Sequence, residues 1–113
     1  RPLLKAVAPV TGRWLDGKVK ASRETTTRDA FAGYLAAWTE TNFADEVKDL
    51  DVPVLVLVGK HDQAMTADAM KQTYLDWLPK AELGVIDNSG HYPMQETPVY
   101  LATRVEAFMR AQA

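Results

Sequence analysis

The stretch that most constrains the fold is an apolar run, Val54–Val58, inside the segment VPVLVLVGKHD. The run contains three valines without a polar residue, which is typical of one strand covered on both faces. Pro53 precedes the run and Gly59 ends it, so both ends of the strand are marked. Asp62 then follows at the carboxyl end, where open parallel sheets gather their ligands and catalytic groups. The alternative is an aspartate that only caps a turn.

A second strand and its helices complete the predicted core. A helix is expected to begin at a Thr66 cap and to end before Pro79, and a strand follows at residues 82–86. Strand, helix and strand in this order form a βαβ unit with parallel neighbours. A last helix is expected after Thr97, with Pro98 at its first position. We therefore predict the α/β class, with parallel strands and flanking helices. The predicted inward-facing residues are Met70, Tyr74, Trp77, Leu78, Leu101, Val105 and Phe108.

The part of the chain before the first strand is predicted to be mainly helical. Residues 1–24 contain scattered prolines and glycines without a sustained period, so we expect irregular or short-helical structure there. A helix is predicted from the threonines at 25–27 to Glu40, and Asn42 caps a short further helix. An apolar stripe at helical spacing follows one side of the longer helix, as core or as the wall of a binding site. Its members are Phe31, Tyr34, Leu35 and Trp38.

Composition excludes several classes of protein. A chain of 113 residues allows one domain, and 13 basic against 15 acidic residues leave no excess charge for nucleic acid or an anionic membrane. Because there is no cysteine, disulfides and thiolate metal sites are excluded. The lack of cysteine fits a reducing compartment, and we expect a cytoplasmic protein. No apolar run approaches the roughly 18 residues that a membrane-spanning helix needs.

A histidine follows the second predicted strand as Asp62 follows the first. His91 lies in a turn just after Asp87, Asn88, Ser89 and Gly90. Adjacent parallel strands are about 4.8 Å apart, so their loops can bring a carboxylate within hydrogen-bond reach of an imidazole. A carboxylate bonded to one ring nitrogen fixes the tautomer and leaves the other nitrogen to take a proton. The alternative is a loop histidine that bonds only a backbone carbonyl.

The two segments resemble the α/β-hydrolase superfamily. The strand followed by GKHD, which ends at Asp62, looks like the penultimate core strand with the acid of the triad. The sequence NSGHYPMQETP around His91 looks like the histidine loop, with Glu-x-Pro leading into the final helix. The resemblance implies that Asp62 is the catalytic acid and His91 the catalytic base. It also implies that residues 52–113 are the C-terminal βαβα part of a hydrolase core, preceded at 1–51 by a helical cap-like segment that returns to the core.

The nucleophile of this superfamily is missing from the sequence. It normally lies in a G-x-S-x-G turn, whereas Ser22 and Ser89 are the only serines and neither has those flanking glycines. The chain opens on Arg1 rather than Met, so we expect a fragment or processed piece of a longer protein. The resemblance then implies the C-terminal part of a serine-type hydrolase of a small ester or lactone. Its nucleophile would come from a missing N-terminal part, and the 113-residue chain alone would be inactive.

Other functions remain open within the same resemblance. Epoxide hydrolases and haloalkane dehalogenases of the superfamily use an aspartate nucleophile, while carbon–carbon hydrolases and cofactor-free peroxidases share the serine version. A non-catalytic fragment or binding module is the third possibility. Two strands alone leave an unpaired edge, so we expect either a complementary N-terminal hydrolase half or self-association.

Ligand sites are the least constrained part of the sequence. Two histidines and a carboxylate, at His61, Asp62 and His91, are a known set of metal ligands, but adjacent His61 would need a bent loop. We therefore expect neither a metal nor a cofactor, and a small molecule as the substrate. Candidates for an apolar substrate pocket are Tyr34, Trp38, Met65 and Met94.

Overall fold

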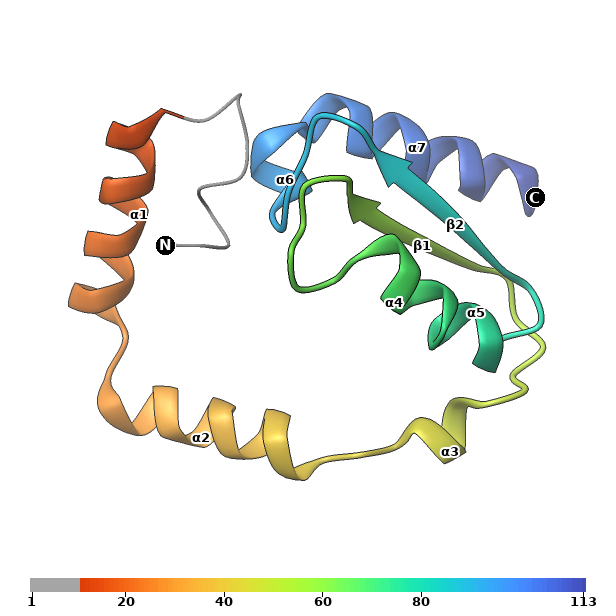
Figure 1. Ribbon diagram of the computed structural model, residues 1–113, viewed down its shortest axis with the longest axis horizontal. Coiled ribbons are helices and arrows are strands. Elements are labelled where there is room, and N and C mark those ends of the chain that lie inside the picture. The colour runs from red at the N-terminus through yellow and green to blue at the C-terminus, as the bar shows by residue number, and fades with distance from the viewer. Residues whose placement is uncertain (1–10) are drawn as a thin grey trace.

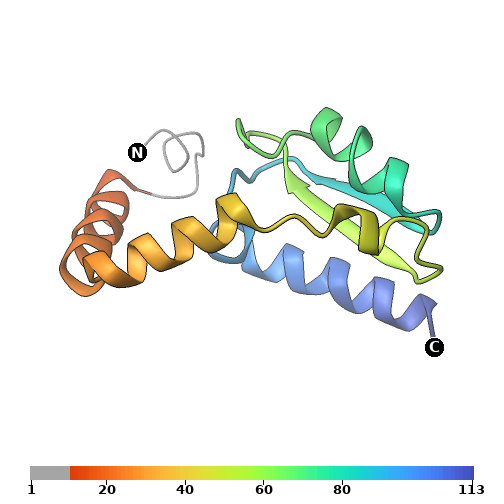
Figure 2. The same cartoon turned by 90° about the horizontal axis from the view of Figure 1, so that it is seen from below.

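A computed structural model of the chain describes residues 11–113, so what we predicted for residues 1–10 lies outside the described part. A two-stranded sheet lies between two layers of helices, α4 with α5 on one face and α7 on the other (Figures 1 and 2). Helices α1 and α2 extend away from this unit as an arm (Figure 1). In chain order the elements are α1 (Gly12–Thr25), α2 (Arg28–Glu40), α3 (Ala44–Val47), β1 (Val54–Gly59), α4 (Ala67–Lys71), α5 (Tyr74–Trp77), β2 (Ala81–Ile86), α6 (Pro93–Glu96) and α7 (Pro98–Ala111).

The sheet confirms the predicted βαβ unit. Strands β1 and β2 pair in parallel, with Val54 opposite Ala81 and Gly59 opposite Ile86. Because the two strands have the same length and register, they end at the same edge of the sheet. The segments that follow them, which carry Asp62 and His91, therefore leave the sheet together. The helices and parallel sheet place the described chain in the α/β class.

The helices around the sheet differ from the prediction in two places. The single helix predicted after Thr66 is divided into α4 and α5, because Thr73 leaves helical geometry at φ −124° and ψ −93°. The one-turn helix α6 was not predicted. Helix α7 begins at Pro98 as expected, but the Thr97 hydroxyl makes no cap and instead donates to the Pro93 carbonyl at 3.4 Å.

The helices before the sheet are more regular and more exposed than predicted. Irregular or short-helical structure was expected up to residue 24, whereas α1 is one continuous helix of 14 residues capped by Thr11. Helix α2 has the predicted extent and the predicted cap, since the Thr27 hydroxyl accepts from the Ala30 N–H. Its apolar stripe is exposed rather than core, with Tyr34 81% and Trp38 74% accessible.

The buried core of the described residues is small. Its buried apolar side chains are Val58 and Ile86 from the two strands, Met70 from α4, and Leu78, which directly follows α5. Two side chains with predicted inward positions, Tyr74 in α5 and Val105 in α7, are exposed. Exposure of this many large apolar side chains is unusual for an isolated domain. No helix within residues 11–113 has the length and hydrophobicity to span a membrane.

Candidate active site

The loop after β1 holds Asp62 in one orientation. The Asp62 N–H donates to the Gly59 carbonyl at 3.1 Å, which closes a turn at the end of the strand. Its Oδ1 accepts two backbone N–H bonds, from Ala64 at 2.8 Å and from Met65 at 3.0 Å. These bonds form a local side-chain turn that orients the carboxylate. The side chain is 5% exposed, and its second oxygen remains available for another donor.

That donor is the imidazole of His91. Asp62 Oδ2 lies 2.8 Å from His91 Nδ1, across 29 residues of sequence. An ionised carboxylate only accepts hydrogen bonds, so Nδ1 carries the proton and Nε2 is left as an acceptor. The His91 side chain is 27% exposed, which keeps the imidazole partly accessible while the carboxylate is buried. The predicted contact between the two loops is therefore present.

Backbone hydrogen bonds join the two loops next to this pair. The Lys60 N–H donates to the Ile86 carbonyl at 2.9 Å, and the His61 N–H donates to the Ser89 carbonyl at 3.0 Å. The backbones approach so closely at Gly59 that an added Cβ would lie 2.5 Å from the Ser89 oxygen and would also clash with the Gly90 oxygen. A glycine is needed here because only a hydrogen atom fits between the two backbone segments.

Replacing Gly59 with alanine is expected to separate the two loops. The added methyl group would overpack a backbone contact that cannot move without breaking the bonds between the loops, at a cost of about 1–3 kcal/mol of unfolding free energy. Urea unfolding of the intact protein measures this loss. Gly17→Ala in α1 is the matched control, because its Cβ would meet nothing within 4 Å and alanine stabilises a helix by about 1 kcal/mol. Equal stability of Gly59→Ala and the wild type would show that the close approach is absent.

The environment of Asp62 keeps its carboxyl group ionised. Burial alone raises the pKa of Asp62, but the N–H donors of Met65 and Ala64 and the hydrogen bond from His91 together lower the pKa below that of an ordinary aspartate. A carboxylate that stays charged can hold the proton on His91 Nδ1 and stabilise an imidazolium. The pair is thus suited to accept a proton at Nε2 and later to return it.

The lowered pKa of Asp62 predicts a loss of stability in acid. A carboxyl group whose pKa is lower in the folded state stabilises the fold above its unfolded pKa, about 4, and this stabilisation falls as the pH drops through the folded pKa. We therefore expect the difference in unfolding free energy between wild type and Asp62→Asn to shrink as the pH falls below about 4. Urea unfolding of both proteins at a series of pH values tests this. A difference that does not change with pH would contradict the assigned pKa direction.

The structure separates the four candidates for a substrate pocket. Met65 lies in the loop after β1 and Met94 in α6, both exposed and each within four residues of the Asp62–His91 pair. Tyr34 and Trp38 lie on α2, which Figure 1 shows away from these loops. A pocket built from these four residues stays a prediction.

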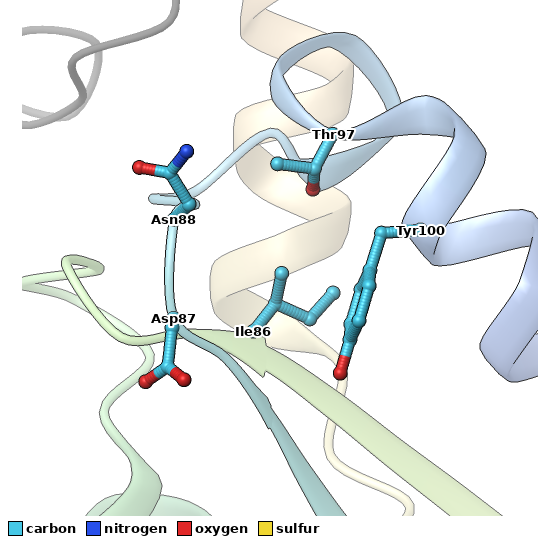
Figure 3. Close-up of a pocket in the computed structure, with 5 residues that line it drawn as sticks. All are labelled: Ile86, Asp87, Asn88, Thr97 and Tyr100. Carbon is cyan, nitrogen blue, oxygen red and sulfur yellow. The ribbon is translucent and has the colours of Figure 1, made fainter.

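A cavity beside the histidine loop is separate from the pair. Its volume is about 300 Å³, and it lies between the end of β2 and the start of α7 (Figure 3). The lining residues are Ile86, Asp87, Asn88, Thr97 and Tyr100. Since none of these is a predicted site residue, the cavity gives no support to a substrate site there.

Two further residues bear on the prediction. His61 is exposed beside Asp62, and no cluster of three or more potential metal ligands occurs within residues 11–113.

Glu96 is a buried acidic residue that the sequence analysis did not single out. Its only signal was its place in the Glu-x-Pro segment before the last helix. Its carboxylate accepts three hydrogen bonds from the histidine loop.

Comparison with known proteins identifies relatives with named activities. The chain is 31% identical to an uncharacterised carboxylesterase, Nap, of Bacillus subtilis over 68 residues, which are 60% of the chain and 23% of the relative. It is 32% identical to a non-heme chloroperoxidase of Streptomyces lividans over 99 residues, 87% of the chain and 33% of the relative. It is 36% identical to non-heme chloroperoxidase CPO-A1 of Kitasatospora aureofaciens over 55 residues, 49% of the chain and 20% of the relative.

These matches extend the resemblance seen in the sequence. A match of 99 residues is longer than residues 52–113, so it includes part of the helical segment before β1. The chain spans a third or less of the length of each of these relatives. No protein-family profile and no solved structure matches the chain.

Proposed function

We propose that this chain, whose relatives belong to the α/β-hydrolase superfamily, supplies the acid and the base of a serine-type esterase. The observation that carries the proposal is the 2.8 Å contact between Asp62 Oδ2 and His91 Nδ1. The contact joins two loops that leave the same edge of a parallel sheet, where catalytic groups collect in such folds.

The proposed chemistry uses both nitrogens of His91. Nε2 takes the proton of a serine hydroxyl while the serine oxygen attacks the ester carbonyl carbon. Asp62 stabilises the imidazolium that forms. The imidazolium then gives its proton to the leaving alcohol as the carbon–oxygen bond of the ester breaks. The same nitrogen then deprotonates a water molecule, whose oxygen attacks the acyl carbon. The proton passes to the serine oxygen as the acyl–serine bond breaks.

The nucleophile is proposed to lie outside residues 1–113. Ser89 is fully buried and its hydroxyl donates to Glu96 at 2.9 Å, so it is held in a structural bond. Ser22 lies in the last turn of helix α1, and Figure 1 places this helix away from the sheet. Neither position is the strand-to-helix turn on which these enzymes carry their serine.

The same proposal accounts for the exposed surface of the described chain. Residues 52–113 would form the end of a hydrolase core, and residues 1–51 a cap-like segment that leads into it. A complementary N-terminal half would pair with the free edge of the sheet and cover apolar side chains that are now exposed, while self-association is the alternative. A cytoplasmic location stays part of the proposal, since the lack of cysteine in residues 1–113 fits a reducing compartment.

The relatives' names support two candidate reactions. The carboxylesterase supports hydrolysis of a small ester or lactone, with water as the second substrate. The two non-heme chloroperoxidases support a second candidate, in which hydrogen peroxide takes the place of water. The same imidazole can deprotonate either molecule, so the Asp62–His91 pair serves both reactions.

Covalent labelling of the full-length protein tests the proposal. We expect a fluorophosphonate to block p-nitrophenyl acetate hydrolysis and to modify one serine outside residues 1–113, as peptide mass spectrometry would show. Addition of hydrogen peroxide to the ester assay separates the two candidate reactions, because only the peroxidase would form peracid. Labelling at Ser22 or Ser89, or hydrolysis that resists the reagent, would contradict a serine nucleophile outside this chain.

A further inference from the structure

Glu96 is a buried carboxylate that the proposed proton transfers do not use. It is 7% exposed and lies at the end of α6, just before α7 begins. Its Oε2 atom accepts three hydrogen bonds, from the Ser89 hydroxyl at 2.9 Å, the Gly90 N–H at 2.7 Å and the Tyr92 N–H at 3.3 Å. Burying a carboxylate is costly unless donors satisfy it, so its position is determined by these bonds.

The three donors surround the catalytic histidine in the sequence. Gly90 and Tyr92 are the two residues that flank His91, and one oxygen atom holds the N–H groups of both. Fixing the peptide groups on either side of a residue fixes the direction of its Cα–Cβ bond. Glu96 therefore fixes the direction of the His91 Cα–Cβ bond, while Asp62 fixes the orientation of the imidazole ring.

Other contacts of the same loop do not replace this one. The His61 N–H reaches the loop at the Ser89 carbonyl, one residue before Gly90, and the close approach at Gly59 lies at the same place. Beyond His91, the Gln95 and Glu96 N–H groups donate to the Tyr92 carbonyl and start α6. In the described loop, the Gly90 and Tyr92 N–H groups both donate to Glu96 Oε2.

We propose that Glu96 is a positioning residue for His91, which holds the backbone on both sides of the histidine so that the imidazole meets Asp62. This inference rests on the proposed function for its effect on rate, but not for its effect on the His91–Asp62 hydrogen bond. A displacement of about 1 Å at a catalytic group can lower a rate about 100-fold.

Three substitutions separate positioning from stability in the full-length protein. Glu96→Asp keeps a carboxylate but shortens the side chain by one methylene, which moves the acceptor oxygen away from its three donors. We expect kcat for p-nitrophenyl acetate to fall at least about tenfold with KM nearly unchanged. Glu96→Gln keeps an acceptor oxygen at the same reach and should retain kcat within about threefold. Ser89→Ala removes only the hydroxyl and leaves both backbone bonds, so it should also stay within about threefold.

A spectroscopic measurement makes the test independent of activity. The proton on His91 Nδ1 is expected as a downfield NMR signal, assigned by its loss in His91→Ala. It should weaken or broaden in Glu96→Asp and persist in Glu96→Gln and Ser89→Ala. If the signal and kcat of Glu96→Asp both equal those of the wild type, or if Glu96→Gln is as impaired as Glu96→Asp, the inference is overturned. Absence of esterase activity with an intact, Glu96-dependent signal would overturn only the proposed function.

Discussion

Replacing His91 with alanine is expected to lower kcat for p-nitrophenyl acetate by about 10⁴-fold or more in the full-length protein, with little change in KM. In the proposed mechanism the imidazole takes and returns the proton at each step, and removal of such a base from a serine protease lowers kcat about 10⁶-fold. The remaining rate reports what binding and the oxyanion donors contribute without the base. Steady-state kinetics at pH 7 measures both constants.

His61→Ala is the matched control for this experiment. His61 precedes Asp62 in the same loop and is exposed, whereas His91 is the ring bonded to the carboxylate. The backbone N–H of His61 makes the bond to Ser89, and alanine keeps that N–H. We therefore expect His61→Ala to stay within about twofold of the wild-type kcat, as surface substitutions usually do. A large loss in His61→Ala with a small one in His91→Ala would move the base from one histidine to the other.

The Asp62–His91 pair could be predicted because it depends on few features. An apolar run fixes each strand, a βαβ order makes the strands parallel, and parallel strands end at one edge. Both side chains lie within five residues of those ends, so little else could separate them. The Asp62 contacts to Ala64 and Met65 follow from the ordinary preference of aspartate for local turns.

Features that depend on tertiary contacts escaped the sequence analysis. Hydrophobic spacing shows that the α2 stripe is apolar, but not whether another segment covers it, and Tyr34 and Trp38 are exposed in the described chain. The break at Thr73 has no glycine or proline to mark it. Glu96 has the composition of a surface residue, and its burial follows only from the three donors that the folded loop turns toward it.

Replacing Asp62 with asparagine is expected to lower kcat about as much as the corresponding change in serine proteases, about 10⁴-fold, although the two side chains have nearly the same shape. The bonds to Asp62 explain why. The N–H groups of Ala64 and Met65 both donate to Oδ1, so the amide oxygen of asparagine is held at that position. The NH₂ group then takes the place of Oδ2, 2.8 Å from His91 Nδ1. Because NH₂ donates, it selects the tautomer with an unprotonated Nδ1.

The proton of neutral His91 then moves to Nε2, where it blocks the nitrogen that must accept a proton from the nucleophile. Asp62→Asn should therefore lose the Nδ1 proton signal in NMR while the fold is kept near pH 7. Asp87→Asn is the control, since Asp87 is exposed and makes only a surface ion pair with Lys60 at 3.1 Å, so kcat should change by less than about twofold. If Asp62→Asn keeps the wild-type rate, His91 does not depend on this carboxylate for its tautomer, and the acid of the proposed triad must be sought elsewhere.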